Sequence, residues 1–451
     1  MSVEEGTVRM SARKMKDSDV AWLGEIPEGW QVYPLKYGFD FSKGLNITKA
    51  DLTEKGVPVI SYGQIHSKRN TGTHLSDELL RYVPCEFVQS DPAAVLQKND
   101  FVFADTSEDL EGLGNCVFID REDTVMAGYH AIVLRPSIDA EHKYLAYLFK
   151  TDCWRRQIRE LAYGIKVYSL SQKILRRCSI LLPPLPEQRR IAAYLDDRCA
   201  RIDSVIETTK ETIEDYKALK QSIIFEAVTG KNVGGKMKDS GVPWIGEIPE
   251  GWVMQQLRPL TVKIGSGKTP LGGANVYSDE GVMFLRSQNI YDDGIRVDDV
   301  SYINEEIDEE MASTRVFKGD VLLNITGGSI GRCCLYDFVE YANVNQHVCI
   351  IRTRTNILQP EYLRFFINGN SIDIVGSNQV GGNRQGLNFE QIGSIKLPLP
   401  RLAEQRQIVA ALDKKCATID SLIAEKLALI ADLEAYKKSL IFESVTGKRV
   451  L

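Results

Sequence analysis

Residues 15–30 read MKDSDVAWLGEIPEGW and residues 237–252 read MKDSGVPWIGEIPEGW, so that only three positions differ. A second matching pair lies further along the chain. Residues 187–231 begin with EQRRIAAYLD and end in IIFEAVTGK, whereas residues 404–448 begin with EQRQIVAALD and end in LIFESVTGK. We call these four segments the frame. A frame that is written twice indicates an internal repeat, and this repeat encloses two stretches that do not match.

The two unmatched stretches are residues 31–186 (insert 1) and residues 253–403 (insert 2), which share only scattered hydrophobic patterning. Both contain short apolar or alternating runs between turn residues, as short strands do. NDFVFADT of insert 1 can be laid over GDVLLNIT of insert 2, and GYHAIVLRP over NQHVCIIRT. We therefore expect one mixed α/β fold with different loops, and short helices near 144–161 and 361–368. Loops usually form the recognition surface of a domain, whereas strands form its core. The pattern therefore predicts one scaffold that presents two different recognition surfaces.

The composition is ordinary for a globular protein. The chain has 451 residues, of which 43% are hydrophobic, enough for several domains with proper cores. No run of eighteen apolar residues predicts a membrane span, and residues 1–14 lack the apolar stretch of a secretory signal. The nine cysteines are scattered without a C-x-x-C motif, which favours reduced thiols over a disulfide frame or a zinc site. We predict a cytoplasmic protein with no membrane contact.

The downstream frame segments have the period of long helices. Apolar or tolerated residues recur at steps of four and three over about four heptads, with charged residues at most positions between them. Each helix would expose this seam unless it packed on a partner, and the obvious partner is its own copy. We therefore predict an antiparallel coiled coil with an approximate two-fold axis; two separate helices, each docked on its own insert, are the alternative. The predicted seams are Leu195, Cys199, Ile202, Ile206, Thr209, Ile213, Tyr216, Lys220 and Ile223, and Leu412, Cys416, Ile419, Ile423, Lys426, Ile430, Leu433, Lys437 and Leu440.

The net charge of −6 is not the footprint of a generic nucleic-acid binder. Charge is nevertheless segregated along the chain, with the acid of insert 2 concentrated between Asp292 and Glu310. For any single basic residue a solvated face is the better interpretation, whereas the clusters favour binding faces. The basic groups are Arg155, Arg156, Arg159, Lys166, Lys173, Arg176 and Arg177 in insert 1, and Arg315, Lys318, Arg332, Arg352, Arg354, Arg364 and Arg384 in insert 2.

Motifs of catalysis are missing from the sequence. It has no [N/D]-P-P-[Y/F] tetrapeptide of an adenine methyltransferase, no H-E-x-x-H and no serine elbow. GSGKT at 265–269 is similar to a phosphate loop, but Val262 stands where the first glycine is required and Pro270 follows directly. His130 and His347 fall at matching places, where a buried hydrogen-bonded histidine and a DNA-facing one are equally good interpretations. We predict a binding protein without a cofactor, a metal or a catalytic site of its own.

Three phrases make the chain similar to a known family. WLGEIPEGW with its repeat WIGEIPEGW, LPPLPEQRRIAAYLD with LPLPRLAEQRQIVAALD, and the helix ends FEAVTGK and FESVTGK resemble the DNA-specificity subunit of type I restriction-modification systems. The resemblance covers residues 15–451. It implies that each insert belongs to a target-recognition domain reading one half of a bipartite, asymmetric site in double-stranded DNA, and that the helices set the spacer. It also implies two modification subunits that methylate adenine, joined by restriction-translocase subunits.

The resemblance divides the chain into six segments. We expect an N-terminal tail (1–14), target-recognition domain 1 (15–186), spacer helix 1 (187–231), a linker (232–236), target-recognition domain 2 (237–403) and spacer helix 2 (404–448). The fold class is thus α+β, with two similar mixed α/β domains joined by two long antiparallel helices in a pseudo-twofold arrangement.

Polar loops beside the predicted strands are the candidate DNA-reading sites. Arg, Asn and Gln suit base edges, whereas Lys and Arg also position phosphates. Replacing Arg384 by alanine is expected to relax one position of the half-site that insert 2 reads. The candidates in insert 1 are Gln64, His66, Lys68, Arg69, Lys166, Tyr168 and Ser169, and those in insert 2 are Ser266, Lys268, Thr269, Arg286, Gln288, Asn289, Asn383, Arg384 and Gln385.

Two other classes of function stay open at this point. The chain could be a scaffold that joins two protein partners without touching DNA, which strong and salt-dependent DNA binding would contradict. It could also be a two-domain enzyme with an unrecognised site, which turnover by the isolated chain would reveal.

Overall fold

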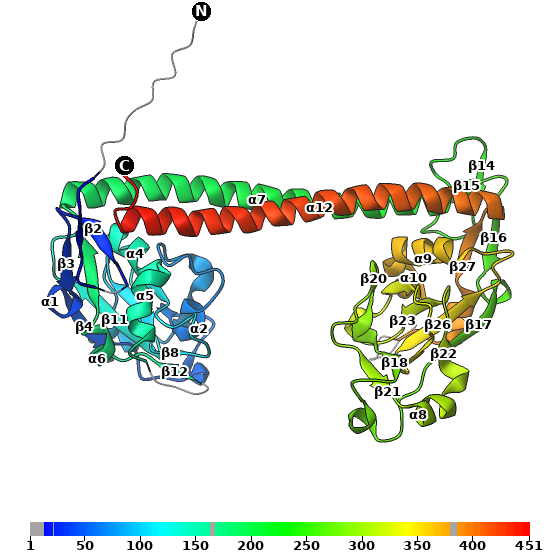
Figure 1. Cartoon of the computed structure of the whole chain (residues 1–451), viewed down its shortest axis with the longest axis horizontal. Coiled ribbons are helices and arrows are strands. Elements are labelled where there is room, and N and C mark those ends of the chain that lie inside the picture. Colours follow the sequence, from blue (N-terminus) through cyan, green and yellow to red (C-terminus); the bar gives the residue numbers. More distant parts are fainter. Residues whose placement is uncertain (1–12, 21, 163–166, 379–385) are drawn as a thin grey trace, which may run out of the picture. The chain divides into compact units, whose positions relative to one another are not determined.

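The computed structural model describes residues 13–20, 22–162, 167–378 and 386–451. It divides into two compact units. Unit 1 combines the chain up to Thr208 with Ala428–Leu451, and unit 2 is Thr209–Leu427. Each unit therefore holds one insert, the beginning of one long helix and the end of the other (Figure 1).

Unit 1 begins with a frame hairpin and continues into short strands and helices. Its strands are β1 (Met15–Asp17), β2 (Glu25–Pro27), β3 (Gln31–Pro34), β4 (Phe39–Lys43), β5 (Val57–Ile60), β6 (Arg81–Val83), β7 (Phe101–Ala104), β8 (Thr106–Ser107), β9 (Cys116–Phe118), β10 (Met126–Ala127), β11 (Ala131–Pro136), β12 (Tyr168–Ser169) and β13 (Ser179–Leu182). Its helices are α1 (Leu35–Gly38), α2 (Tyr62–Ile65), α3 (Phe87–Ser90), α4 (His142–Lys150), α5 (Asp152–Arg159) and α6 (Gln172–Leu175), before the long α7 (Leu185–Thr229).

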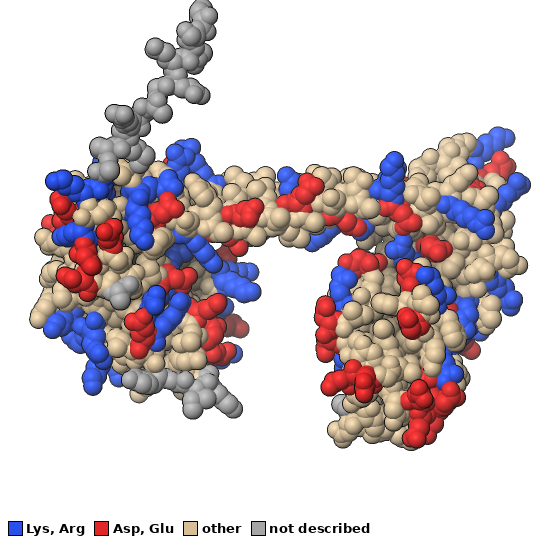
Figure 2. Space-filling model, in the orientation of Figure 1, with Lys and Arg blue, Asp and Glu red and all other residues tan. Residues whose placement is uncertain are grey.

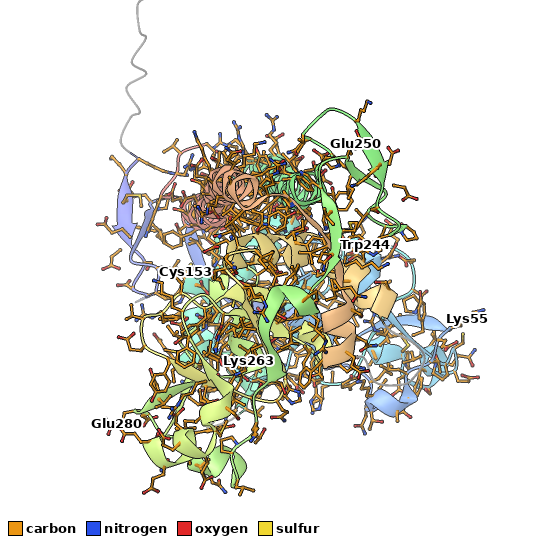
Figure 3. The ribbon with its side chains drawn as sticks, turned by 90° about the vertical axis from the view of Figure 1, so that its right-hand side faces the viewer. Lys55, Cys153, Trp244, Glu250, Lys263 and Glu280 are labelled. Carbon is orange, nitrogen blue, oxygen red and sulfur yellow. The ribbon has the colours of Figure 1, made fainter. Side chains whose placement is uncertain are left out.

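Unit 2 also begins with a frame hairpin and continues into short strands and helices, which different loops connect. Its strands are β14 (Met237–Asp239), β15 (Glu247–Pro249), β16 (Val253–Gln256), β17 (Thr261–Ser266), β18 (Val282–Leu285), β19 (Ile290–Tyr291), β20 (Gly294–Ile295), β21 (Ser301–Ile303), β22 (Arg315–Val316), β23 (Val321–Asn324), β24 (Cys333–Leu335), β25 (Ala342–Val344), β26 (Val348–Thr353) and β27 (Lys396–Leu399). Its helices are α8 (Glu305–Glu310), α9 (Pro360–Gly369), α10 (Ser371–Asn378), α11 (Phe389–Ser394) and the long α12 (Leu402–Val445). In Figure 3, Glu250 marks the end of the β14–β15 hairpin, and Glu280 marks the turn before β18 at the opposite end of insert 2.

Both inserts are built on the same antiparallel four-stranded sheet. Its order is β4-β11-β7-β9 in insert 1 and β17-β26-β23-β24 in insert 2. One buried ion pair recurs in the two sheets: Arg135 on β11 donates to Asp100 at 2.7 Å, and Arg352 on β26 donates to Asp320 at 2.7 Å. The predicted overlay of NDFVFADT on GDVLLNIT and of GYHAIVLRP on NQHVCIIRT is therefore confirmed, because these phrases form the matching strand pairs β7–β11 and β23–β26.

The helical stretch expected at residues 144–161 is two helices, α4 and α5, with a break at Thr151. Thr151 has an extended backbone, with φ of −75° and ψ of 143°, and its hydroxyl accepts a hydrogen bond from the Trp154 amide at 3.4 Å. A threonine that caps the following turn competes with helix continuation. The pattern of apolar residues alone did not reveal this break.

The long helices α7 and α12 pack antiparallel in each unit. In unit 1, Lys437 of α12 donates to Asp203 of α7 at 2.5 Å. In unit 2, Lys220 of α7 donates to Asp420 of α12 at 2.7 Å. Lys437 and Lys220 are equivalent positions of the frame repeat, and so are Asp203 and Asp420. The lysine lies on α12 in unit 1 and on α7 in unit 2. Seam residues such as Leu195, Ile206 and Leu412 are buried, as predicted, and none of the helices in the described ranges is both long and apolar enough to cross a membrane.

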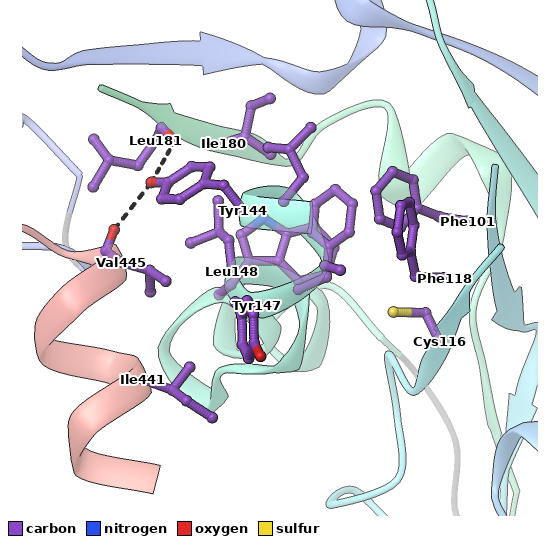
Figure 4. Packing of buried hydrophobic residues seen from close by; sticks show 14 of the residues in the cluster. Phe101, Cys116, Phe118, Tyr144, Tyr147, Leu148, Ile180, Leu181, Ile441 and Val445 are labelled. Carbon is purple, nitrogen blue, oxygen red and sulfur yellow. Dashed lines mark hydrogen bonds between the residues drawn. The ribbon is translucent and has the colours of Figure 1, made fainter. Parts of the chain in front are cut away.

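The helix ends are fixed to the inserts by repeated frame contacts. Trp30 donates its indole N–H to Glu187 at 3.0 Å, and Trp252 does the same to Glu404 at 3.0 Å. In insert 1 the Tyr144 hydroxyl lies 3.0 Å from the Leu181 carbonyl and 3.1 Å from the Val445 carbonyl (Figure 4). Burial raises the pKa of Tyr144 well above its ordinary value, so the ring stays neutral and its hydroxyl keeps the proton it donates.

Candidate nucleic-acid interface

In insert 1 the loops that follow β5 and β7 and precede β11 meet at one end of the four-stranded sheet. We call this region loop end 1. His66, in the turn after α2, has its Nε2 2.7 Å from the Thr106 carbonyl oxygen, so Nε2 is the donor. Asn115 then donates to His66 Nδ1 at 3.1 Å. β12 pairs with β8 through Tyr168 and Ser169, which adds a third loop to the same region.

Loop end 1 contains a cavity of about 780 Å³. Its walls include Tyr62, His66 and His130, and the ring of Tyr62 lies 5.5 Å from that of His130 and 5.6 Å from that of Tyr129. Such T-shaped contacts between rings stabilise the wall. The lining also includes the carboxylates Glu108, Asp109 and Glu111, which lie in the loop after β8 and which no sequence motif singles out.

The candidates of insert 1 divide into exposed and structural side chains. Lys68 and Arg69 are exposed, although Arg69 pairs with Glu78 at 3.1 Å. The Gln64 side chain accepts from the Ser61 amide at 3.2 Å and so caps α2. His66 is half-buried and holds the β7 loop, whereas Ser169 is exposed. Lys166 lies outside the described residues.

In insert 2 the corresponding region, loop end 2, gathers the loops after β17, β18 and β23 and before β26. Thr269 hydrogen bonds to Gln346, Gln346 to His347 at 3.1 Å, and His347 Nδ1 lies 2.6 Å from the Thr326 hydroxyl. His130 of loop end 1 makes the equivalent contact, with Nδ1 3.0 Å from Asp105. Each histidine thus joins the start of one sheet strand to the end of its neighbour; His130 is exposed and His347 half-buried.

The GSGKT sequence of insert 2 lies in this region and is not built as a phosphate loop. β17 extends to Ser266, and a side chain at Gly267 would collide with the Val344 carbonyl oxygen. Lys268 follows with its amide donating to that carbonyl at 3.2 Å, and it is exposed, as is Thr269. Ser266 is half-buried and bonds to the Gly267 carbonyl at 3.2 Å. The glycine therefore serves close strand packing. Lys268 is exposed beside it, whereas the exposed Thr269 is bonded to Gln346.

The Arg286–Asn289 turn is held by Asp299. Gln288 donates to the Asp299 carboxylate at 2.7 Å, and Arg286 donates to the Asp299 carbonyl at 3.0 Å. Asn289 is only 2% exposed, and its amide bonds to the Arg286 N–H and to the Arg296 carbonyl. Gln288 is thus available at the surface, whereas Asn289 positions the turn. Asn383, Arg384 and Gln385 lie outside the described residues.

The basic clusters do not form one continuous face. Arg315 and Arg352 are committed to Asp308 and Asp320 inside insert 2. Lys173, Arg176 and Arg177 line a shallow hollow of about 750 Å³ with Lys36, whereas Arg155 and Arg159 face α12. Figure 2 shows a group of acidic side chains over α8, and others elsewhere on unit 2. Within the described ranges no group of three or more His, Cys, Asp and Glu is arranged to hold a metal ion.

The geometry agrees with comparison to known proteins. Residues 27–215 and residues 249–431 each match the type I restriction modification DNA specificity domain. The chain belongs to this family. Its two matches fall on the two inserts and on the helix beginnings that follow them.

Named members of the family are similar over almost the whole chain. The specificity subunit of the type I restriction enzyme EcoKI from Escherichia coli strain K12 is 23% identical over 437 residues, covering 94% of this chain and 90% of the relative. A putative specificity subunit, MjaX, from Methanocaldococcus jannaschii is 27% identical over 440 residues, covering 94% and 95%.

Solved structures share the fold. A chain from a type I R-M system, solved to explain complex assembly and conformational transition, has a TM-score of 0.69 at 19% identity and covers 93% of this chain and 98% of its own. The HsdS subunit from Thermoanaerobacter tengcongensis has a TM-score of 0.51 at 18% identity, covering 94% and 98%. These two solved chains therefore share the fold of this chain over almost its whole length.

Proposed function

We propose that the chain selects the DNA target of a type I restriction-modification complex, with loop end 1 reading one half of a bipartite, asymmetric site and loop end 2 the other. One observation carries this proposal: the same frame contacts hold two loop ends of different chemistry. Loop end 1 presents aromatic rings, histidines and carboxylates, whereas loop end 2 presents Lys268, Arg286 and Gln288. Two halves that read the same sequence would not need different side chains.

Two polar side chains beside strand β18, the half-buried Arg286 and the exposed Gln288, suit direct reading of base edges. Both follow the end of strand β18. Arginine recognises guanine and glutamine adenine through paired hydrogen bonds. Their bonds to Asp299 hold both side chains in one orientation, which reduces the entropy lost on binding. Lys68, Lys268 and, from the residues that the structure does not describe, Lys166 are proposed to contact phosphates.

We further propose that the helices set the spacer and present two equivalent docking surfaces for modification subunits, which restriction-translocase subunits then join. The E-Q-R phrase recurs at the start of both helices, but its glutamines, Gln188 and Gln405, are 3% and 0% exposed and cannot contact a partner. They bond instead to the Glu141 and Gln359 amides at 2.9 and 2.8 Å. The neighbouring Arg189 has a side chain that is 67% exposed and remains available. Methylation and cleavage would be supplied by the partner subunits.

The experiment is an exchange of one insert. Residues 31–186 are replaced by the insert of another family member, the chain is expressed with its modification partner, and adenine methylation is sequenced across the genome. We expect one half of the methylated motif to change and the other half, with the spacer, to stay. The reciprocal exchange of residues 253–403 is the matched control and should change the opposite half.

Two outcomes would contradict the proposal. A simultaneous change of both halves would show that the inserts do not read independently. Absence of any methylated motif, together with DNA binding that salt does not weaken, would favour the protein scaffold instead. Docking is tested separately by native mass spectrometry, in which a single tightly bound modification subunit would contradict two equivalent surfaces.

A further inference from the structure

A second cavity of unit 1, of about 710 Å³, lies where α4 and α5 meet the end of α12. We call it the basic cavity. Four cationic side chains line it, Lys150, Arg155, Arg159 and Lys438, against two acidic ones, Glu111 and Asp152. Basic side chains also gather beneath the end of α12 in unit 1 in Figure 2.

The two arginines are fixed in place by neutral groups and one carboxylate. Arg155 donates to the Asn115 side chain at 2.6 Å and to the Phe149 carbonyl at 3.2 Å. Arg159 donates to Asp152 at 3.0 Å and to the Glu111 carbonyl at 3.0 Å. Its Nε is buried and has no hydrogen-bond partner among the described residues. The two arginines therefore form a rigid cationic wall. Only Arg159 of the two is paired with a carboxylate.

Lys150 and Lys438 have no paired carboxylate within the described ranges, and Lys150 is the more buried of the two. Lys150 is half-buried, and within the described ranges its side chain makes neither a hydrogen bond nor an ion pair. Burial, together with the nearby Lys437, lowers the pKa of Lys150 to about 8. An ammonium that loses water without gaining an anion destabilises a fold. A bound anion would supply the missing charge.

Unit 2 shows that the fold does not require this charge. The frame repeat places Gln221 at the position of Lys438, and α9 places Asn368 at that of Lys150. A cavity of about 850 Å³ lies there too, lined by five cationic and five acidic side chains. Four of its cations are paired: Lys217 with Glu214, Lys220 with Asp420, Arg364 with Asp413 and Arg296 with Asp293. The excess of positive charge is therefore a property of unit 1 alone.

The basic cavity adjoins loop end 1. The two cavities share Glu111 and Asn115, and Asn115 bonds to His66 on one side and to Arg155 on the other. Loop end 1 carries Glu108, Asp109 and Glu111, which repel a nucleic acid. The neighbouring cations are the groups that can offset this repulsion.

We propose that the basic cavity binds a backbone phosphate of the DNA that loop end 1 reads, with Lys150 and Lys438 supplying the charge. This inference rests on the proposed function. A phosphate held there fixes the register of the duplex against loop end 1. Because Lys438 belongs to α12, the same contact ties the helix pair to the DNA.

The first test measures DNA affinity against salt. The full chain with its modification subunits is titrated with a duplex carrying the methylated motif and with an unrelated duplex, by fluorescence anisotropy between 50 and 200 mM salt. Lys150→Gln and Lys438→Gln should each weaken binding to both duplexes and lower the salt slope by about one; each would thus reduce the affinity loss across this range by roughly 3.5-fold. Lys98→Gln, which removes a surface lysine of the same unit that is paired with Glu122 at 2.8 Å, is the matched control and should leave the slope unchanged.

The second test locates the phosphate. Single methylphosphonate substitutions along both DNA strands each remove one phosphate charge. At one position the substitution should weaken DNA binding by the unaltered complex but should not change DNA binding by the Lys150→Gln complex. The proposal would be overturned if Lys150→Gln and Lys438→Gln had the same salt slope as Lys98→Gln and no methylphosphonate position behaved in this way. So would loss of modification subunits from Lys150→Gln in native mass spectra without DNA, which would assign the cavity to an acidic protein segment. If the unaltered complex prefers neither duplex but the slopes still differ, the cavity proposal stands and half-site reading fails.

Discussion

Tyr144 and Val445 are 301 positions apart, yet the tyrosine hydroxyl lies 3.1 Å from the valine carbonyl oxygen. Tyr362 makes the equivalent contact with Val228 at 3.0 Å. Each hydroxyl also reaches the last strand of its own insert, at Leu181 and at Pro398. One buried tyrosine in each unit therefore fastens a helix end and an insert strand together.

Replacing Tyr144 by phenylalanine should destabilise unit 1. The change keeps the ring but leaves buried carbonyls without their donor, at a cost of about 1–3 kcal/mol. Urea unfolding of the full chain, followed by tryptophan fluorescence, measures the effect. Tyr37→Phe is the control, because Tyr37 is 65% exposed. Equal midpoints for the two variants would show that the hydroxyl does not stabilise this joint.

Gly447→Ala should loosen the end of α12 from the first frame hairpin. Gly447 has φ of +74°, and an added Cβ would lie 2.5 Å from Pro27. Gly234→Ala is a matched control, because Gly234 has φ of +73° with nothing within 4 Å. Both variants carry the strain of a left-handed residue, so the difference between their melting temperatures isolates the packing contact. Melting at the same temperature would mean that Pro27 moves aside freely.

Gln288→Ala and Asn289→Ala should have different effects although they are neighbours. Loss of the exposed Gln288 should relax one position of the half-site read by insert 2, by roughly 1–3 kcal/mol of discrimination. Loss of the buried Asn289 should instead lower stability, because three hydrogen bonds of the turn disappear. Methylation sequencing and thermal unfolding separate the two. A specificity change from Asn289→Ala at unchanged stability would contradict this assignment.

Lengthening both helices should change the spacer alone. The two units divide after Thr208 and after Leu427, so seven residues inserted near Thr209 and near Lys426 keep the heptad register and leave each insert with its own helix contacts. Each helix becomes roughly 10 Å longer. We expect a methylated motif whose spacer is longer by about one to three base pairs, or loss of methylation if the added rotation of the DNA cannot be absorbed. Altered half-sites, or activity with the original spacer, would contradict a role as a ruler.

DNA affinity should depend on pH through Lys150. The pKa of Lys150 is lowered to about 8 by burial and by Lys437, with Arg155 acting in the same direction and with Cys199 and Asp203 opposing them. A bound phosphate would raise this pKa, so binding takes up a proton above pH 8, and affinity should fall by up to about tenfold per pH unit there. Below pH 8 the ammonium is already charged and the dependence vanishes. Lys150→Arg stays charged and should give a flat profile; identical profiles for the two proteins would exclude Lys150.

Much of the fold could be predicted from the sequence, because its signals are local or repeated. The frame phrases fix which segments correspond, and the heptad period fixes which helix face is buried, as Leu195 and Leu412 show. The two central strand pairs could be matched because their phrases keep the alternation of a sheet.

The interface was harder to predict, because side-chain exposure in loops depends on contacts distant in sequence. Arg286, Gln288 and Asn289 are equally polar, and only the path of the chain to Asp299 determines which of them reaches the surface. Likewise, Asn115 connects His66 to Arg155 across 49 and 40 positions, respectively. No periodicity in the chain records such contacts.

The joint made by Tyr144 and Tyr362 uses main-chain carbonyls as acceptors, and every residue has one. The turns at Val228 and Val445 can therefore change their side chains without losing the bond, provided that they remain helical. The tyrosine and the last strand of an insert therefore contact the helix end partly through groups that any side chains at these positions would leave in place. If the two inserts read DNA independently, as we propose, genetic recombination within the frame is expected to create a new pair of half-sites in one step.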